Sequence, residues 1–521
     1  MNYKLLGKVL GKIMILEGIL MLAPLLVSII YKEGITNHIA FIVPICALFL
    51  LGALMQLPKP KRTSLYQKEG FALTATVWIV MTLFGAVPFV INGDIPNYVD
   101  ACFEIMSGFT TTGASIITDI TVISFSSLFW RSFSHWIGGM GILVFVLIFI
   151  PESNDGSSMH LLRAESPGPQ VGKIASKMKV TARILYLIYL CLTVSEVIVL
   201  MCGPLIDYSA LFEAGYTQYE GNKLFYALLT SFGSAGTGGF GFIPNSMEFM
   251  HPFAQYVISI FLIIFGCNFA LYYLIIIGKA RAVFKSEEFR SYLTILVVAI
   301  SLIFINIATR LDALGYSLEE AFRHSLFQVA SIITTTGYST TNYNLWPMVS
   351  KMVIVILMFT GAMAGSTAGG IKLSRIVIAV KGTLINIRKL INPRYVPKVK
   401  FEGKSIEEKT TNNVFSFITL YSIFLIFVVF ILSFDPINGV SVTIESDLGK
   451  DVSTHGFFSN FSAALSCLSN IGPGFDTIGP YSSFAGYSWF SKLLLTFTML
   501  LGRLEIFPVL ILFSHRTWKR V

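Results

Sequence analysis

Residues 109–115 read FTTTGAS, and a near copy, ITTTGYS, occupies residues 333–339. A run of threonines that ends in glycine is a poor membrane helix, because β-branched residues and glycine both disfavour helix. Yet each copy lies between two apolar segments that are long enough to cross a bilayer. The fold therefore depends on what a polar, non-helical segment does between two membrane spans.

The composition is that of a polytopic membrane protein. The chain has 521 residues, of which 54% are hydrophobic and 13% are charged, whereas soluble proteins carry about 25% charged residues. The six cysteines show no CxxC or other metal-ligand spacing, so we expect core packing rather than a zinc site or a disulfide. Basic cytoplasmic loops explain the net charge of +9 better than a nucleic-acid partner does.

Ten segments are long and apolar enough to span a bilayer. They are roughly residues 8–31, 36–57, 70–92, 125–150, 181–203, 253–279, 290–309, 349–385, 413–434 and 487–513. Lys and Arg gather at the N-terminus, after every second span and at the C-terminus, which predicts that both termini are cytoplasmic. The opposite side is richer in Asp and Glu, and such an acidic outer mouth concentrates cations.

Four segments between these spans share one pattern: a moderately apolar stretch, too short to span, followed by hydroxyl residues and glycine. They read FEIMSGFTTTGAS (103–115), LLTSFGSAGTGGFG (228–241), LFQVASIITTTGYS (326–339) and FSAALSCLSNIGPGFD (461–476). This pattern is typical of a re-entrant half-helix followed by a return loop. Residues 70–513 therefore read as four copies of span, pore helix, loop and span.

The chemistry of these loops favours a cation pathway. Non-helical backbone at membrane depth is tolerated only where it is buried in protein or lines a wet cavity. Four such loops around one axis would turn their carbonyls inward, and a ring of carbonyl oxygens replaces the hydration shell of a monovalent cation. The third half-helix has a predicted capping box, Ser317 with Glu320. Ordinary surface loops would explain a single threonine run, but not four loops of one pattern at matching positions.

Single features of the sequence suggest three other interpretations. GTGGFG at 236–241 matches the dinucleotide fingerprint but lacks its βαβ setting, so we expect no nucleotide site in this chain. An enzyme would need convergent catalytic groups, and the neighbours Ser134 and His135 have no oxyanion site; we expect a structural role for His135. A secondary transporter of sodium or another solute, built on discontinuous helices, stays open as the alternative.

Seven motifs, in order along the chain, resemble the Trk/Ktr/HKT superfamily of potassium transporters, and most of all its bacterial TrkH-type subunits. They are SGFTTTGAS (107–115), WIGGMGILV (136–144), GTGGFG (236–241), ITTTGYSTT (333–341), AGSTAGGIKLSR (364–375), SNIGPG (469–474) and GRLEIFPVL (502–510). The resemblance implies an all-α polytopic membrane protein with four membrane–pore-loop–membrane repeats around a pseudo-fourfold pore. The expected units are an extra helix pair at 1–65 and repeats at 66–160, 161–285, 286–400 and 401–521.

The resemblance also implies a selectivity filter for potassium, the transported ion, with no cofactor. Its four filter glycines map onto Gly113, Gly239, Gly337 and Gly472. The expected ion-binding residues are Thr111, Thr112, Gly113, Thr237, Gly238, Gly239, Thr335, Thr336, Gly337, Asn470, Ile471 and Gly472. The adjacent glycines of the second segment leave its register open by one residue.

A gate is expected at residues 364–370 of the eighth span, because this glycine-rich stretch favours a broken helix over a glycine face for helix packing. The expected gate residues are Gly365, Ser366, Thr367, Gly369, Gly370 and Arg503. Arg503 lies in the middle of the last span, where a charge is costly and indicates function; the alternative is an internal pair with Glu505. Lys372 is expected to lie toward the cytoplasmic end and to snorkel. The resemblance places an intramembrane loop beneath the filter, close to the arginine.

The resemblance finally implies partners and a location. Its members form homodimers and assemble with a cytoplasmic ring of TrkA-like nucleotide-binding regulatory subunits. We therefore expect a multi-pass protein of the bacterial inner (plasma) membrane, surrounded by lipid, with no nucleic acid bound.

Overall fold

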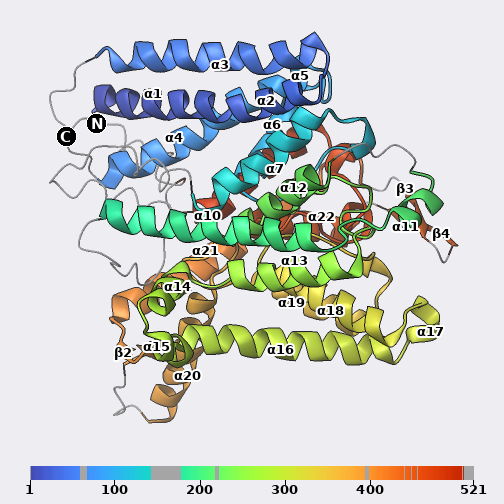
Figure 1. Cartoon of the computed structure of the whole chain (residues 1–521). Coiled ribbons are helices and arrows are strands. Elements are labelled where there is room, and N and C mark those ends of the chain that lie inside the picture. The colour runs from blue at the N-terminus through green and yellow to red at the C-terminus, as the bar shows by residue number, and fades with distance from the viewer. Residues whose placement is uncertain are drawn as a thin grey trace.

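The computed structural model describes residues 2–58, 67–141, 178–216, 222–392, 398–438, 441–446, 449–454, 456–506 and 509. In this part of the chain the fold is a bundle of helices (Figure 1). Two short antiparallel hairpins, which the all-α prediction did not include, add to it. They are β1 (Lys400–Phe401) with β2 (Lys404–Ser405), and β3 (Ser441–Ser446) with β4 (Gly449–Thr454).

The N-terminal helices pack together at one edge of the bundle (Figure 1). They are α1 (Tyr3–Leu20), α2 (Leu22–Ile30) and α3 (Ile35–Gln56), with α1 and α2 in succession against α3. Glycines let α1 and α3 approach closely, as in membrane helix pairs. A Cβ atom added to Gly11 would lie 2.7 Å from the carbonyl oxygen of Gly52, and the reverse substitution meets the same distance.

Four units follow, each with a first helix, a short helix and a second helix. The first helices are α4 (Gln67–Gly85) with α5 (Val87–Ile91), α10 (Met178–Cys202), α16 (Glu287–Ala308) and α21 (Glu408–Leu432). The short helices are α6 (Tyr98–Phe109), α12 (Lys223–Gly236), α18 (Leu318–Ile333) and α22 (Phe457–Ser469). The second helices are α7 (Phe125–Gly139), α13 (Pro252–Phe265) with α14 (Phe269–Ile276), α19 (Met348–Phe359) with α20 (Leu373–Ile391), and α23 (Trp489–Arg503).

Shorter elements connect these helices. They are η1 (Ile120–Val122), α11 (Tyr208–Glu213), α15 (Ala280–Lys285), α17 (Leu311–Leu314), η2 (Tyr343–Leu345), η3 (Asp476–Ile478) and η4 (Phe484–Gly486).

The packing of the short helices joins the four units into a closed circle. Each short helix packs against both flanking helices of its own unit. It also packs against the second helix of the unit before it: α12 against α7, α18 against α13 and α22 against α19. The contact of α6 with α23 joins the first unit to the last. The four units therefore surround one axis in chain order.

Several helices are long and apolar enough to cross a membrane. Six stretches of the described residues qualify: Tyr3–Ile30, Ile35–Gln56, Glu69–Ile91, Val180–Cys202, Glu287–Ala308 and Glu408–Leu432. A seventh results if α13 and α14, which meet at a bend of 90°, count as one span. The predicted spans 125–150 and 487–513 lie partly outside the described residues, and the predicted span 349–385 is divided into α19 and α20.

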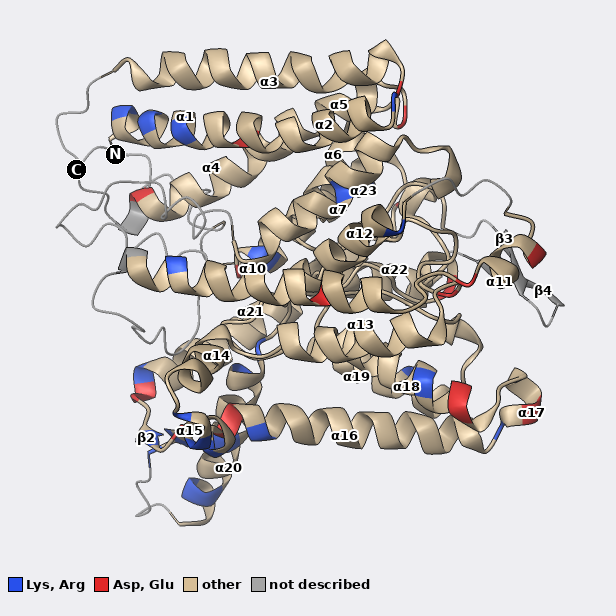
Figure 2. Ribbon diagram, viewed as in Figure 1, with Lys and Arg blue, Asp and Glu red and all other residues tan. Residues whose placement is uncertain are grey.

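The charges are polarised along the bundle (Figure 2). Lys and Arg of α1, α15 and α20 gather at one end, while Asp and Glu of α17 and of the start of α18 lie at the other. This separation agrees with the basic and acidic sides expected from the sequence.

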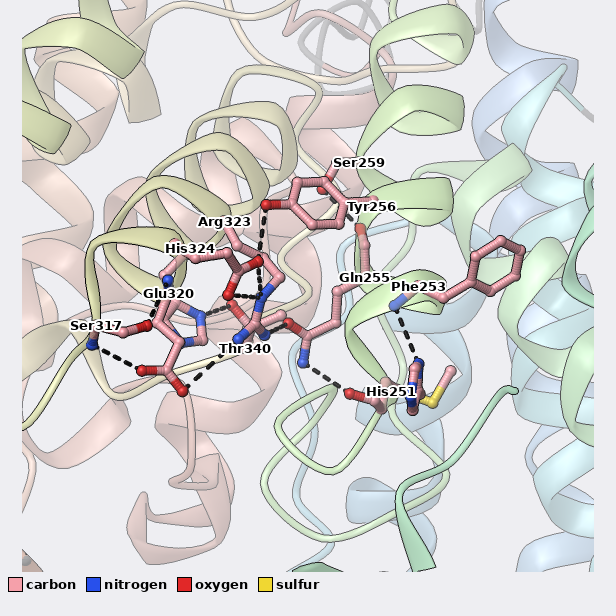
Figure 3. Close-up of polar contacts among 12 residues, drawn as sticks. His251, Phe253, Gln255, Tyr256, Ser259, Ser317, Glu320, Arg323, His324 and Thr340 are labelled. Atoms are coloured by element: carbon pink, nitrogen blue, oxygen red, sulfur yellow. Dashed lines mark hydrogen bonds and ion pairs between the residues drawn. The ribbon is translucent and has the colours of Figure 1, made fainter. Parts of the chain in front are cut away.

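The third short helix is anchored by polar side chains at its start (Figure 3). The predicted capping box is confirmed: the Glu320 N–H donates to Ser317 Oγ (3.2 Å), and the Ser317 N–H donates to the Glu320 carboxylate (2.8 Å). Arg323 donates to Glu319 (3.0 Å) and to Gln255 of the preceding unit. These bonds fix α18 against α13.

Candidate functional site

All four short helices end in the same way, at segments that we call the central segments: residues 110–113, 236–239, 334–337 and 469–472. The N–H of the third residue of each segment donates to the carbonyl five residues earlier. The bonds are Thr112 to Ser107 (2.9 Å), Gly238 to Gly233 (2.8 Å), Thr336 to Ser331 (2.8 Å) and Ile471 to Ser466 (2.9 Å). This bond closes the C-terminal end of each short helix, where the second residue of the segment adopts a left-handed conformation.

The backbone of the central segments is strained at one equivalent position. The second residue of each has a positive φ: Thr111 (54°), Thr237 (53°), Thr335 (54°) and Asn470 (56°). The fourth is a glycine with positive φ: Gly113 (79°), Gly239 (81°), Gly337 (84°) and Gly472 (104°). A threonine in this conformation costs about 1–2 kcal/mol, and such strain gathers at functional sites. In the second segment, Thr237 has the conformation of Thr111, and Gly239 that of Gly113.

The four glycines bring the segments into backbone contact around one axis. A Cβ atom added to Gly113 would overlap the carbonyl oxygen of Gly238 in the next segment. The same holds for Gly239 against Thr336 and for Gly337 against Ile471. A Cβ on Gly472 would lie 2.6 Å from the Thr112 carbonyl oxygen, so the fourth segment contacts the first and the ring is closed. Only glycine fits this ring, and all four glycines line one cavity of about 400 Å³.

Side chains of the central segments are buried and tied to each other. The predicted site residues Thr111, Thr112, Thr237, Thr335, Thr336, Asn470 and Ile471 have no exposed surface. Thr112 Oγ1 shares a hydrogen bond with Thr110 (2.7 Å) and accepts another from Asn470 Nδ2 (3.0 Å). The asparagine that departs from the threonine pattern therefore joins the fourth segment to the first.

His135 of α7 has the structural role expected of it. Its Nδ1 donates to the Gly108 carbonyl (2.8 Å), and its Nε2 accepts from the Phe240 N–H (3.2 Å). A Cβ on Gly238 would overlap the imidazole ring. The histidine thus joins the first short helix to the second central segment.

Residues 360–372, between α19 and α20, form a loop that contacts the central segments. The Gly361 N–H donates to the Ile371 carbonyl (2.8 Å), so the two ends of the loop lie side by side. The Gly369 N–H donates to Thr335 Oγ1 (2.7 Å), and a Cβ on Gly369 would lie 2.6 Å from the Ser469 oxygen. The stretch is therefore a folded loop under the third and fourth segments rather than a helical glycine face.

The other predicted gate residues hold this loop to the second unit or turn its backbone. The Gly365 carbonyl accepts from the Phe269 N–H (3.1 Å), and Thr367 Oγ1 donates to the Phe265 carbonyl (3.5 Å). Ser366 bonds within the loop, to the Met363 carbonyl (2.7 Å). Gly370 has a positive φ of 66°.

Arg503 connects the loop to the first unit. Its guanidinium donates to Thr111 Oγ1 (3.2 Å) and to the Thr367 carbonyl (2.9 Å). It also donates to the carbonyls of Gly138 and Gly139 (2.7 Å for Gly139) at the C-terminal end of α7, where a cation is favoured. Glu505, the alternative partner considered from the sequence, forms an ion pair with Arg375.

Two residues below the ring differ from expectation. Lys372 was expected to snorkel, and this is wrong: its side chain is buried, and Nζ donates to the Ala368 carbonyl, because the loop folds back over it. Glu288 was missed. Its Oε1 accepts from the N–H groups of Ala364 (2.8 Å) and Ser374 (3.2 Å), one at each side of the loop. Its one sequence signal was a carboxylate at the start of a membrane helix.

Comparisons with known proteins agree with this geometry. The family model of TrkH, described as a cation transport protein, matches residues 37–520. The chain belongs to the TrkH family of cation transport proteins. It is therefore a member of a family of transporters and not of enzymes, as the motifs indicated.

Relatives match over the full length. The chain is 32% identical to the Trk system potassium uptake protein TrkH of Vibrio parahaemolyticus, with all of both chains covered. It is 31% identical, again over all of both chains, to the protein of the same name from Escherichia coli. The crystal structure of the potassium transporter TrkH from Vibrio parahaemolyticus superposes with a TM-score of 0.81 at 28% identity, covering all of both chains.

Proposed function

We propose that this chain takes up potassium through a pore along the axis of the four units, with the central segments as its selectivity filter. The observation that carries this proposal is the closed ring of four positive-φ glycines, each against the backbone of the next segment. Backbone held this closely presents carbonyl oxygens that replace the hydration shell of a monovalent cation. The expected ion ligands are Thr111, Thr112, Thr237, Gly238, Thr335, Thr336, Asn470 and Ile471.

The loop at residues 360–372 is the proposed gate, together with Arg503. In this arrangement it lies across the inner side of the ring, bonded to Thr335 and, through Arg503, to Thr111. The cationic guanidinium adds an electrostatic barrier to the obstruction. Opening would move the loop away from both threonines.

The expected partners complete the proposal. The basic end of the bundle is proposed to face the cytoplasm, as the positive-inside rule predicts, with both termini inside. The family resemblance supports the proposal that the membrane is the bacterial inner membrane. A cytoplasmic ring of nucleotide-binding regulatory subunits is proposed to act on the loop, and two copies of the chain are proposed to form a homodimer. The support for ring and dimer is the family resemblance.

The test is uptake of rubidium-86 into potassium-loaded liposomes. Wild type is compared with Gly113→Ser, which puts a side chain against Gly238, and with Gly34→Ala, whose added Cβ meets nothing within 4 Å. We expect potassium to block wild-type uptake and sodium to block it only weakly. We expect altered selectivity in Gly113→Ser but not in Gly34→Ala. If the chain alone is inactive, the regulatory partner and nucleotide are added. Uptake driven or blocked by sodium or an organic solute, with Gly113→Ser unchanged, would instead favour the secondary transporter.

A further inference from the structure

Glu104 and Arg131 form a buried ion pair at the cavity above the ring. Arg131 Nη2 lies 2.7 Å from Glu104 Oε1, and the side chains are 3% and 0% exposed. Glu104 comes from the first short helix and Arg131 from the second helix of the same unit. Arg131 lines the cavity of about 400 Å³ that the four ring glycines also line.

The pair binds the chain beyond the ring glycine in two units. Glu104 accepts from Ser115 Oγ (3.0 Å) and from the Ile116 N–H (2.9 Å) in the first unit. Arg131 donates to the Gly241 carbonyl (3.2 Å) in the second unit, and its guanidinium lies 4.2 Å from the centre of the Phe240 ring. Ser115 and Gly241 each lie two residues after their ring glycine.

The other units show that this charge is not required by the fold. Nine residues before the ring glycine, where the first unit has Glu104, the other units have Thr230, Gln328 and Ala463. In the third unit Gln328 accepts from Ser339 Oγ (3.0 Å), the same bond that Glu104 makes with Ser115. At the equivalent position the neutral amide of Gln328 therefore accepts the hydroxyl hydrogen bond without carrying a charge.

What the carboxylate adds is charge compensation. A guanidinium stays protonated, and at a cavity on the path to the ring it repels an approaching cation. A buried charge that loses its partner is not compensated by solvent. Glu104 cancels the charge of Arg131, while Arg131 keeps its bonds to the second unit.

We propose that Glu104 determines the affinity of the outer mouth for potassium by neutralising Arg131, a role that rests on the proposed pore function. Glu104 then determines the affinity of the mouth for the cation, and Arg131 is the charge that it compensates. The proposal predicts a change in KM from loss of the carboxylate and its reversal when the arginine charge is removed as well.

The experiment measures KM and maximal rate of rubidium uptake, with or without regulatory partner, under conditions in which the wild type is active. Glu104→Gln, which copies the amide of the third unit, is expected to raise KM about tenfold with a smaller change in maximal rate. The double variant Glu104→Gln/Arg131→Met is expected to return KM to within about twofold of wild type. Glu408→Gln, at an exposed carboxylate of the opposite, basic end of the bundle, is the control that leaves KM unchanged.

The outcomes separate the two proposals. A wild type that takes up no potassium-competed rubidium under any condition refutes the pore, and this inference with it. An active wild type with an unchanged KM in Glu104→Gln refutes the role of Glu104 alone. So does a double variant whose KM stays as high as that of the single one. If Glu104→Gln fails to fold, the double variant decides alone, since a KM raised tenfold in it overturns charge compensation.

Discussion

The backbone N–H of Gly369 donates to the hydroxyl of Thr335 over 2.7 Å, so the loop is fixed to the strained residue of the third central segment. The equivalent residue of the first segment, Thr111, accepts from Arg503, which also holds the loop at Thr367. The first and third segments lie on opposite sides of the ring. The position of the loop and the conformation of two opposite segments are therefore coupled by hydrogen bonds.

Substitution of Gly369 by alanine is expected to release this contact. The added methyl would lie 2.6 Å from the Ser469 carbonyl oxygen and 2.9 Å from Asn470 Cβ, so the loop must move away. Overpacking of this kind costs about 1–3 kcal/mol, and a closed state weakened by 1.4 kcal/mol opens about tenfold more often. Rubidium uptake into liposomes without a regulatory partner should rise by about that factor. Gly34→Ala should leave uptake unchanged, and equal uptake in all three proteins would exclude a gating role for the loop.

Glu288 is expected to be needed for the resting position of the loop. Its carboxylate is the acceptor for the N–H groups of the partly buried Ala364 and the buried Ser374, and Glu288→Ala removes that acceptor from both. Each unsatisfied buried donor costs about 1–3 kcal/mol. Glu288→Ala should therefore raise the uptake without partner and lower the melting temperature, and Glu288→Gln, which keeps one oxygen, should do so less. The exposed Glu408→Gln is the control, and a variant Glu288→Ala that stays as tightly shut as wild type would contradict this role.

Much of the fold followed from the sequence because membrane helices obey local rules. Apolar length predicted spans such as 413–434, and the structure has α21 there. The spacing of Ser317 and Glu320 predicted a helix start that depends on neighbouring atoms alone. The bend of 90° after α13 was not predicted; α14 begins anew there, with Asn268 accepting from the Ala270 N–H.

The site was predictable in its residues but not in its contacts. Repetition along the chain located the central segments, since four glycines recur after four short helices. The partners of Arg503 among the described residues, by contrast, include three carbonyls and a hydroxyl from residues far away in sequence. Backbone carbonyls leave no signal in side-chain identity, so the nearby Glu505 was the visible candidate. Glu288 was missed and Lys372 was misjudged for a similar reason, because the fold of the loop decides the surroundings of both side chains.

The capping box of α18 predicts a pH dependence of stability. The Ser317 N–H that donates to the Glu320 carboxylate lowers the pKa of that carboxyl below its ordinary value of 4.5. A lowered pKa in the folded state stabilises the fold above the ordinary pKa, and this stabilisation is lost as the pH falls through the lowered one. Glu320→Gln should therefore have a lower melting temperature than the wild type at pH 7. The loss in the free energy of unfolding should be at most about 1 kcal/mol. The difference should vanish in acid, and one that is equal at pH 7 and pH 3 would contradict this assignment.

Arg503 is expected to be the strongest single determinant of the closed state. Charged hydrogen bonds contribute about 1.5–3 kcal/mol each, and Arg503→Ala removes those to Thr111, Thr367, Gly138 and Gly139 together. Uptake of rubidium without a partner should rise by at least about tenfold. Arg503→Lys keeps the positive charge but loses the planar guanidinium and its paired donors. It therefore separates the electrostatic barrier from the hydrogen bonds that hold the loop. If the barrier is mainly electrostatic, the lysine variant stays shut; if the hydrogen bonds hold the loop, it leaks nearly as much as alanine. Unchanged uptake in both variants would show that Arg503 holds helices together without closing the pathway.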